Sequence, residues 1–501
     1  MAKQTMNVTR WLNIAVLVVI LVAFCFQAFF ALPKLSATVD EPAHLVAGYS
    51  YWQTHDFRMN PEHPPLAKLI AALPLLWIHP AFDTAHADWK LAAEYDAGYK
   101  LLYQNDADRL LFWSRAAMVV LAAVGLIGTF LWARDLFGTP SGLFAACMYA
   151  FSPNLLAHGM LVTTDAAVAV FTVWTLYLFW KQRDIATGLA LGAAMASKFS
   201  GALLPVLLIV FCVLRDGRAA VKRLLVIGCA SLLVIEAAYF FSQSPLTYLK
   251  NAALVNANHL RNYPFYLFGR LKSGGWWYYF PAAFAVKATI PTLLLIAFAI
   301  VHSTRGVVQR WGEILLLASI GCYVIVISIA ADQIGIRYLL PIFPLVFVWT
   351  SRVIPSLSRT RVGIAILATL LTWQTWSAIR AFPNYISYFN EFARGADPAA
   401  LDDSNIDWGQ GIKQAAEYVR SHHLENVNLY TFSPFDNPPY YGLPPNIPPS
   451  QAFDRLVVHR PSPGVYIISA HYVTRITAVS PIWKTYKRID RIAGSLWVYA
   501  F

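Results

Sequence analysis

Apolar segments of membrane-spanning character recur along this chain and limit it to one class of fold. They lie at about 11–33, 110–133, 141–158, 165–180, 185–197, 200–214, 223–241, 284–302, 312–331, 337–351 and 361–380. Because lipid offers no partner for backbone polar groups, such segments cross a membrane as helices. Hydrophobic residues make up 57% of the chain and charged residues only 13%, as in polytopic membrane proteins. We therefore expect a mainly α-helical integral membrane protein with about eleven transmembrane helices.

Short basic clusters between the apolar segments predict the orientation of the chain. Lys3 and Arg10 precede the first segment, which predicts a cytoplasmic N-terminus. The later clusters share that side only if residues 185–214 cross the membrane twice, as two short spans hinged at Ser197–Gly201. One long helix with Lys198 at mid-membrane would reverse the predicted orientation of every later segment and bury a charged side chain in the membrane. We therefore predict the hinge and an extracytoplasmic C-terminus.

Three features of the sequence argue against other classes of protein. The net charge of +12 comes from scattered orientation clusters rather than one basic patch, so we expect no nucleic-acid partner. The apolar run at 11–31 is longer than a typical signal-peptide core and has no clear small-residue cleavage site, which favours a retained anchor. The five cysteines lie in apolar runs without paired or metal-like spacing, so we expect neither a disulfide framework nor a cysteine metal site.

Two long loops and a C-terminal region are predicted outside the membrane. The loops cover residues 34–109 and 242–283, and the first has helical patterning at about 44–54 and 66–79. Residues 384–501 are more polar, with a helical run at about 409–421 and strand-like runs at about 426–432, 464–470 and 494–500. The sequence thus predicts a transmembrane domain over 1–383 and a small soluble α/β domain over 384–501.

An acidic pair, Asp40-Glu41, directly follows the first apolar segment. A carboxylate at a low-dielectric boundary is suited to take a proton from an acceptor hydroxyl or amine, so both are candidate catalytic residues. The alternative is a pair of capping acids, since Asp-Glu-Pro also suits a helix N-terminus. Residues further along the same loop favour the catalytic interpretation.

The second polar block of this loop is Glu62-His63-Pro64-Pro65-Leu66-Ala67-Lys68. Its two prolines can open a helix at Leu66, whose first amide groups would then form an anion site. His63 and Lys68 flank that site and are candidate ligands for a phosphate at the membrane surface. The alternative is an interfacial loop with a snorkelling lysine.

Three more charged residues lie at the predicted outer ends of spans. Asp165 could position an acceptor, share a divalent cation with Asp40, or simply cap its helix. Lys198 at the hinge and Arg337 at the start of a later span could both face a lipid-linked phosphate. The alternatives are snorkelling for Lys198 and an ion pair with Asp332 for Arg337.

The second loop mixes cations with aromatic rings, including His259, Arg261, Arg270 and the run Trp276-Trp277-Tyr278-Tyr279. Rings with interspersed cations suit sugar stacking and phosphate contacts, so the cations are candidate substrate-binding residues. An aromatic belt at the membrane surface is the alternative for the Trp-Tyr run.

These blocks, in this order, resemble the GT-C superfamily of polyprenyl-phosphate-sugar-dependent glycosyltransferases. The resemblance is to the protein O-mannosyltransferase-like branch, which includes the lipid A aminoarabinose transferases. The residues that carry it are Asp40-Glu41, His63 to Lys68, Thr164-Asp165, Ser197-Lys198 and Arg337-Tyr338-Leu339-Leu340-Pro341. Residues 402–410 also look like a segment found in bacterial members of this branch.

The resemblance implies inverting transfer of a sugar from a polyprenyl-phosphate carrier. We expect a lipid, glycan or protein acceptor, and the short loops favour a bacterial inner membrane. The resemblance also implies Asp40 as the base and a place near the carrier phosphate for His63, with Lys68, Lys198 and Arg337 as further phosphate ligands. Tyr338 joins the substrate-binding residues. Relatives differ in metal dependence, so a divalent cation is neither implied nor excluded.

Two departures leave the acceptor open. Loop 242–283 is too short for the β-trefoil domain of eukaryotic protein mannosyltransferases. Residues 62–65 read Glu-His-Pro-Pro, where aminoarabinose transferases have Glu-Lys-Pro-Pro. Neither a protein nor lipid A is therefore implied as the acceptor.

A transporter or flippase for a lipid-linked anion is the alternative from another class. It would use the same cations without bond cleavage, but it should consist of two related halves, and the sequence contains no visible repeat. A membrane scaffold with an exported domain would explain the spans but not the charged residues of loop 34–109. The sequence therefore favours an enzyme.

Overall fold

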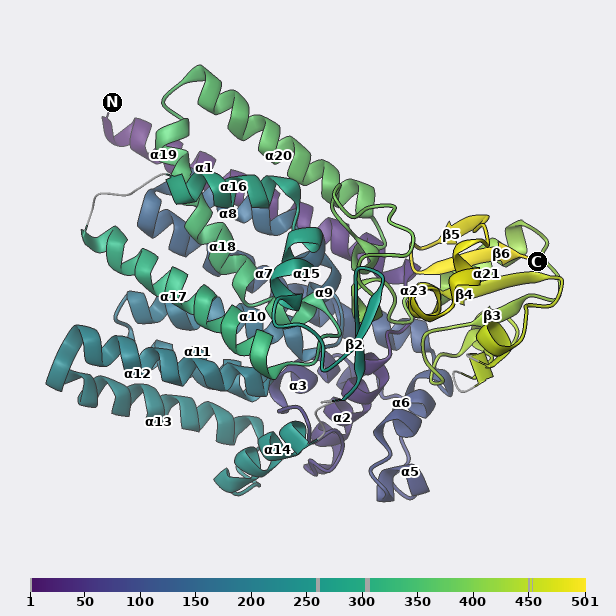
Figure 1. Cartoon of the computed structure of the whole chain (residues 1–501). Coiled ribbons are helices and arrows are strands. Elements are labelled where there is room, and N and C mark those ends of the chain that lie inside the picture. Colours follow the sequence, from purple (N-terminus) through teal and green to yellow (C-terminus); the bar gives the residue numbers. More distant parts are fainter. Residues whose placement is uncertain (1, 258–261, 302–306, 449–450, 453) are drawn as a thin grey trace.

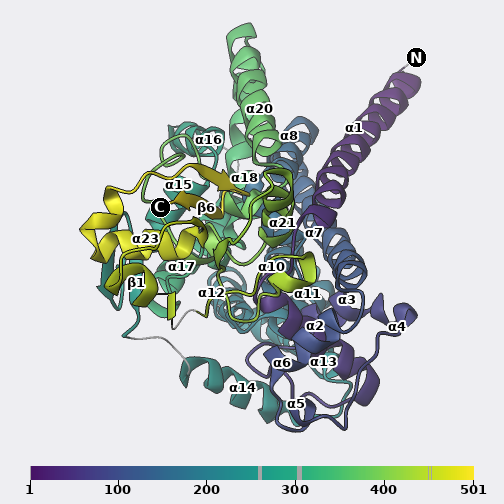
Figure 2. The same ribbon diagram turned by 90° about the vertical axis from the view of Figure 1, so that its right-hand side faces the viewer.

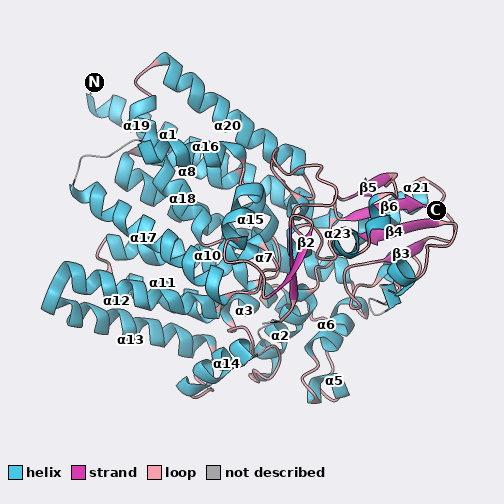
Figure 3. Ribbon diagram, in the orientation of Figure 1, coloured by secondary structure: helices cyan, strands magenta, loops and turns pink. Residues whose placement is uncertain are grey.

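The computed structural model describes residues 2–257, 262–301, 307–448, 451–452 and 454–501. Long helices run side by side in a bundle, and most of the strands gather beyond one end of it (Figures 1 and 3). The helices are α1 (Ala2–Ala31), α2 (Asp40–Thr54), α3 (Leu66–Ala72), α4 (Leu75–Ile78), α5 (Ala87–Lys90), α6 (Glu94–Tyr103), α7 (Ala107–Phe137), α8 (Thr139–Ala150), α9 (Pro153–Gly159), α10 (Thr164–Trp180), α11 (Asp184–Ser197), α12 (Leu203–Asp216), α13 (Ala220–Ala238), α14 (Pro245–Ala257), α15 (Tyr279–Lys287), α16 (Ile290–Val301), α17 (Val307–Ala330), α18 (Ile342–Thr350), α19 (Ile354–Leu357), α20 (Arg361–Ala381), α21 (Ile412–Ser421) and α23 (Ala470–Val479). The strands are β1 (Pro264–Leu267), β2 (Arg270–Ser273), β3 (Asn428–Tyr430), β4 (Val465–Ser469), β5 (Asp490–Ile492) and β6 (Leu496–Ala500).

Several helices can cross a membrane. Within the described ranges, five are long and apolar enough, namely Arg10–Lys34, Ala107–Phe137, Phe199–Ala238, Arg310–Ala330 and Arg361–Ala381. Two bent pairs, α9 with α10 (115°) and α15 with α16 (113°), raise the number to at most seven if each pair is one span. The chain is thus a helical membrane protein, but the expected number of eleven spans is not confirmed.

The chain reverses direction at Lys198. Gly188 of α11 faces the backbone of Ile227, and Gly192, one turn later, faces Ser231. Because a Cβ atom would lie only 2.4 Å and 2.5 Å from these carbonyl oxygens, the two glycines let α11 and α13 pack closely and in parallel. α12, which connects α11 to α13 in the sequence, must therefore run in the opposite direction to both helices. The predicted hinge at Ser197–Gly201 is thus present.

The first long loop is a compact helical unit. It contains α2 to α6, with helices at both places that the sequence indicated, and its buried residues form a core of their own against α7, α10 and α11. Viewed from that end, these helices lie next to the C-terminal elements (Figure 2). A stacked pair, Tyr95 and Phe435 at 4.9 Å, is one of the contacts between them.

The C-terminal residues form a four-stranded sheet with the order β3-β4-β6-β5. β3 is parallel to β4, whereas β6 is antiparallel to both of its neighbours. Successive side chains alternate between the two faces, so Ile467 and Val498 pack in one cluster with residues of α21 while Ile468 and Trp497 join the main core of the molecule. The sheet is therefore anchored on the bundle through one of its faces.

Candidate active site

Asp40 is held in place by a segment far along the chain. Residues 36–39, just before α2, pair with residues 408–412: the amide of Val39 donates to the carbonyl of Trp408 (3.0 Å), and that of Ser36 donates to Gln410 (3.2 Å). The Ser36 hydroxyl also donates to the carbonyl of Gly409 (2.7 Å). We call residues 402–412 the C-terminal clamp. It fixes the first residue of α2, which is Asp40.

The clamp also positions Arg337. Asn405 Oδ1 accepts a hydrogen bond from the amide of Ile336 (2.9 Å), and the Ser404 hydroxyl donates to the carbonyl of Ile334 (2.6 Å). The ring of Trp408 lies 4.3 Å from the guanidinium carbon of Arg337, a cation–π contact. One buried segment thus aligns two residues that are distant in sequence.

Four charged side chains from four elements meet at this place. Arg337 Nη1 lies 2.9 Å from Asp40 Oδ2 and 3.7 Å from Asp165 Oδ2, and Lys198 Nζ donates to Asp165 Oδ1. Asp165 and Lys198 are almost completely buried, whereas a fifth of the Asp40 side chain stays exposed. Asp40, Asp165, Lys198 and Arg337 were all expected from the sequence, and the structure brings them together.

Some polar atoms of this cluster lack partners. Asp165 Oδ2, Arg337 Nε and Thr163 Oγ1 are buried without a hydrogen bond to any described residue. Unsatisfied buried polar atoms are costly and uncommon, and they concentrate where a ligand completes them. The cluster can therefore accept further polar contacts.

Glu41 faces away from this opening. Its Oε1 accepts from Arg115 Nε (2.8 Å) and the amide of Val162 (3.0 Å), and its Oε2 accepts from Arg115 Nη2 (2.5 Å) and the amide of Thr38 (2.8 Å). Burial favours the neutral acid, but Arg115 and these amides outweigh it, and the pKa of Glu41 is lowered. Glu41 thus joins α2 to α7 as a permanently charged, fully enclosed carboxylate.

Lys68 ties its loop together instead of facing the cluster. Its ammonium donates to the Tyr51 hydroxyl (2.9 Å) and to the carbonyls of Asn60 and His63 (2.7 Å each). Burial lowers the pKa of Lys68 to about 7. The helix that the two prolines open, α3, has only seven residues, so its dipole adds little to an anion site.

His63 does approach the cluster. Its ring packs against that of His44 at 5.2 Å, and it lines a groove together with Lys198. Burial, with the nearby His44 and Lys198, holds the pKa of His63 well below its usual range. His63 is therefore a neutral imidazole that can hydrogen-bond a phosphate but does not add a positive charge.

The groove is largely apolar and has a volume of about 380 Å³. Its polar end contains Glu62, His63, Lys198, Asp332 and Tyr338, and Lys198 Nζ lies 4.7 Å from the Tyr338 ring centre. Elsewhere it is lined by apolar side chains of α12, α14 and α17, including Leu203, Val206, Val255, Val326, Ile327 and Ala330. Its apolar lining suits a hydrocarbon chain, and Lys198 is the cation among its lining residues that can contact an anion.

The remaining expected substrate-binding residues are not gathered here, apart from Tyr338. Arg270 is exposed at the start of β2, in a hairpin whose β1 strand docks on the C-terminal residues, where Arg475 donates to the carbonyl of Pro264 (2.6 Å). It forms no ion pair with the cluster. His259 and Arg261 lie outside the described residues.

Sequence reasoning missed the role of the acidic clamp. Asp402 and Asp407 are buried and Asp403 is partly buried. Burial raises the pKa values of Asp402 and Asp403, and repulsion from Asp403 adds to the rise for Asp402, although Arg475 pairs with Asp402 at 2.7 Å. Burial raises the pKa of Asp407 to about 6, although the Ser469 hydroxyl (2.5 Å) and the Gly409 amide (3.0 Å) donate to it. The sequence indicated this segment only through its resemblance to a segment of bacterial family members, which did not predict its contacts beside Asp40 and Arg337.

The arrangement does not fit a divalent cation between Asp40 and Asp165. Arg337 lies between the two carboxylates and contacts both. Across the described part of the chain, no three His, Cys, Asp or Glu side chains come close enough together to hold a metal ion. We therefore derive no step through a metal, and the shared cation stays a prediction.

Comparisons with known proteins agree with this fold. Residues 107–241 match the family model described as dolichyl-phosphate-mannose-protein mannosyltransferase. A comparison with curated proteins gave no match. ArnT from Cupriavidus metallidurans bound to undecaprenyl phosphate has a TM-score of 0.52 and 15% identity, covering 98% of this chain and 98% of ArnT. The structure of ArnT in the apo state has a TM-score of 0.51 and 15% identity, covering 100% of this chain and 98% of ArnT.

A second solved structure is less similar. The archaeal oligosaccharyltransferase AglB from Archaeoglobus fulgidus, in complex with an inhibitory peptide and a dolichol-phosphate, has a TM-score of 0.49 and 10% identity, over 82% of this chain and 58% of AglB. The chain has the fold of ArnT over nearly its whole length, and its central segment matches the mannosyltransferase family model. The resemblance to the GT-C superfamily is thereby confirmed.

Proposed function

We propose that this protein is a membrane glycosyltransferase that moves a sugar from a polyprenyl-phosphate carrier to an extracytoplasmic acceptor, with inversion at the anomeric carbon. One observation carries the proposal: an apolar groove ends at Lys198 and His63, and Lys198 belongs to the same charged cluster as Asp40. The isoprenoid tail would lie in the groove, and the phosphate would lie beside Lys198, His63 and Arg337.

The charges of the cluster suit the two ends of the reaction. The acceptor hydroxyl or amine would give its proton to Asp40, whose second oxygen accepts no hydrogen bond from any described residue. As the acceptor attacks, the bond between sugar and phosphate oxygen breaks, and its electron pair stays on the phosphate. Lys198 and Arg337 would stabilise the resulting dianion in a low-dielectric setting. Asp165 would hold both cations in place.

The fold supports this scheme. The solved ArnT structure of the same fold contains undecaprenyl phosphate, and the matching family model is that of dolichyl-phosphate-mannose-dependent enzymes. We place the protein in a bacterial inner membrane, with the N-terminus in the cytoplasm and residues 384–501 outside. Asp40, Asp165, Lys198 and Arg337 would then lie at the outer surface, where the acceptor is a lipid, glycan or protein.

The test is sugar transfer in membranes that contain the full chain, with a panel of labelled polyprenyl-phosphate sugars. We expect wild type to release polyprenyl phosphate and the Asp40→Asn variant to do so about 10²–10⁴-fold more slowly. The control is Asp56→Asn, a partly exposed acid of the same loop whose ion pair among the described residues is with Arg58. Equal release by wild type and Asp40→Asn would reject Asp40 as the base and make Asp165 the next candidate. Tight carrier binding without any release would favour a lipid transporter.

A further inference from the structure

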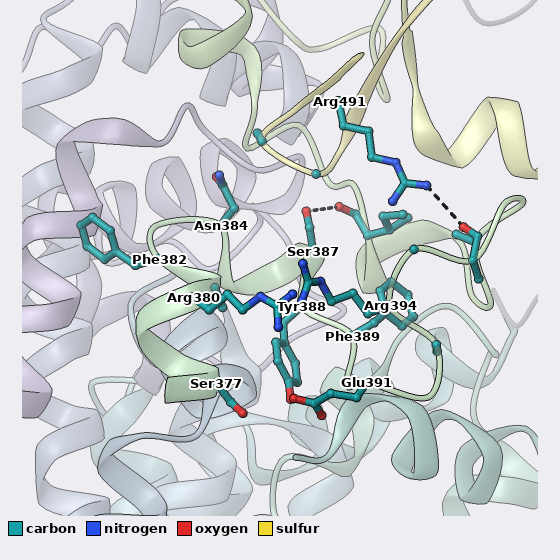
Figure 4. A pocket seen from close by; sticks show the side chains of 18 of the residues that line it. Ser377, Arg380, Phe382, Asn384, Ser387, Tyr388, Phe389, Glu391, Arg394 and Arg491 are labelled. Carbon is teal, nitrogen blue, oxygen red and sulfur yellow. Dashed lines mark hydrogen bonds between the residues drawn. The ribbon is translucent and has the colours of Figure 1, made fainter. Parts of the chain in front are cut away.

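A second pocket, of about 260 Å³, lies where the end of α20 meets the C-terminal sheet. Figure 4 shows the side chains around it. It is lined by polar residues after α20, by the turn between β5 and β6, and by three arginines: Arg380, Arg394 and Arg491. None of these arginines belongs to the cluster around Asp40.

The arginines are not neutralised within the protein. The side chains of Arg380 and Arg394 point toward one another in Figure 4, and neither forms an ion pair with a described residue. Arg491 donates to the carbonyl of Ala396 (3.5 Å) and lies over the ring of Trp497 (5.0 Å), and its Nε atom is buried without a hydrogen bond to any described residue. Like charges that converge in this way repel each other unless an anion lies between them.

The acids nearby offset only part of this charge. Glu391 lines the pocket and accepts a hydrogen bond from the indole of Trp373 (3.0 Å), so one carboxylate stands against three guanidinium groups. Asp397 pairs with Arg488 at 2.9 Å. The pocket therefore keeps an excess of positive charge, and its open hydrogen-bond donors suit an anion with several acceptor oxygens.

The surroundings of the pocket are those of a membrane surface. Arg380 lies in the last turn of α20, a helix long and apolar enough to cross a membrane. On the same helix Trp376 and Ile379 are more than half exposed, and Phe392 beside the pocket is 76% exposed. Exposed aromatic residues next to arginines are typical of the level at which lipid headgroups lie.

We propose that this pocket binds the phosphate group of an anionic membrane lipid, and that the lipid's acyl chains lie along α20 beside Trp376 and Ile379. A guanidinium pair holds a phosphate through bidentate hydrogen bonds. The proposal does not depend on sugar transfer, because the lipid here is neither donor nor acceptor.

A lipid bound in the pocket would also affect the C-terminal clamp. Ile406 lines the pocket, and Ser387, another lining residue, donates its hydroxyl hydrogen to the Ile406 carbonyl (2.7 Å) and accepts from Gln410 Nε2 (3.3 Å). These residues belong to or contact the segment that aligns Asp40 and Arg337. A bound lipid would therefore stabilise the folded clamp, which a melting experiment can measure.

The test uses the purified full chain in a neutral detergent, with added phosphatidylglycerol, phosphatidylcholine or inorganic phosphate. Native mass spectrometry counts the bound lipid, and thermal unfolding reports the shift in Tm. We expect phosphatidylglycerol to bind and raise the Tm, and phosphatidylcholine to bind at least about tenfold more weakly. The Arg380→Gln/Arg394→Gln double variant should lose that preference, and Arg380→Lys/Arg394→Lys should keep part of it.

Arg361→Gln is the matched control, since Arg361 is an exposed arginine at the opposite end of α20. It should keep the full preference for phosphatidylglycerol. The proposal is overturned if the double glutamine variant binds phosphatidylglycerol as tightly as wild type does. An equal Tm shift with inorganic phosphate would reject the lipid and assign the pocket to a soluble phosphate compound.

Discussion

Arg337 and Asp40 form an ion pair of 2.9 Å between Nη1 and Oδ2, although 297 positions separate them along the chain. Asp40 is the first residue of α2, and Arg337 is the second residue of the short turn Ile336–Leu339 before α18. Neither element fixes the other directly. The pair exists because the C-terminal clamp binds the backbone beside both residues.

Arg337→Lys should reduce kcat/KM about 10²-fold while leaving the Tm nearly unchanged. A lysine keeps the charge but cannot contact Asp40, Asp165 and a phosphate at once, nor stack on Trp408 in the same way. The measurement is steady-state transfer with the purified enzyme. Arg270→Lys, in the exposed hairpin, is the control and should behave as wild type does. An unchanged kcat/KM for Arg337→Lys would contradict the proposed role.

Glu41→Gln should lower the free energy of unfolding. The change leaves the enclosed Arg115 without its counter-charge, which costs about 3–5 kcal/mol in buried ion pairs. Unfolding in detergent measures the loss, and Asp56→Asn, which breaks the exposed pair with Arg58, should cost about 0–1 kcal/mol. If Glu41→Gln abolished transfer at unchanged stability, Glu41 would have to be considered as the base again.

Two substitutions of Trp408 should separate stacking from packing. Phenylalanine keeps an aromatic face toward Arg337, whereas leucine fills space without one. Because a cation–π contact contributes about 0.5–2 kcal/mol, Trp408→Leu should turn over roughly tenfold more slowly than Trp408→Phe. Initial rates at saturating donor give the comparison. Equal rates for the two variants would mean that Trp408 serves only as packing.

A double variant should separate the effects of Lys198 and Asp165 on carrier affinity and on stability. Lys198→Met removes a phosphate ligand and also leaves Asp165 short of a partner, so carrier affinity should fall about tenfold or more and the Tm should fall as well. Adding Asp165→Asn should recover much of the Tm without recovering the affinity. Binding of undecaprenyl phosphate and thermal unfolding measure the two effects. Recovery of carrier binding in the double variant would show that Lys198 acts only through Asp165.

Asp407 should give the C-terminal residues a measurable pH dependence. Its pKa is raised to about 6 in the folded protein, so its favourable contribution is complete below about pH 4 and is lost as the pH rises through 6. Asp407→Asn cannot ionise, so its stability relative to wild type should increase over that window, by at most about 3 kcal/mol. Thermal unfolding of both proteins between pH 4 and pH 8 gives the difference. A constant difference would mean that Asp407 does not titrate on folding.

The fold was largely predictable because lipid imposes a strong local pattern. Each predicted span contains a helix. The positions of the basic clusters between the spans are sufficient to predict the reversal at Lys198. In the C-terminal residues, β3, β4 and β6 lie where strands were expected. β5 and α23 were missed, because β5 has only three residues and α23 mixes polar and apolar residues without a clear boundary.

The site was predictable only in part. Asp40, Asp165, Lys198 and Arg337 came from their positions at span ends and from the family resemblance. The enclosure of Glu41 was missed, although Arg115, a lone arginine inside the predicted span 110–133, was a visible sign that some acid must pair with it. Trp408 and Asn405 act through contacts with residues far away in sequence, and no periodic pattern records such contacts.

The pairing of residues 36–39 with 408–412 also sets an order of events during synthesis. The Ser36 hydroxyl and the Gly409 carbonyl are 373 positions apart, so their hydrogen bond closes a loop that contains every helix of the bundle after α1. In the proposed orientation, all of those helices must be inserted, and residues 402–412 must have crossed to the outer side, before Asp40 and Arg337 are aligned. A nascent chain whose membrane helices are already inserted therefore still lacks the aligned pair of Asp40 and Arg337. In the proposed function, an incomplete chain in the bilayer therefore cannot release sugar from its carrier into water.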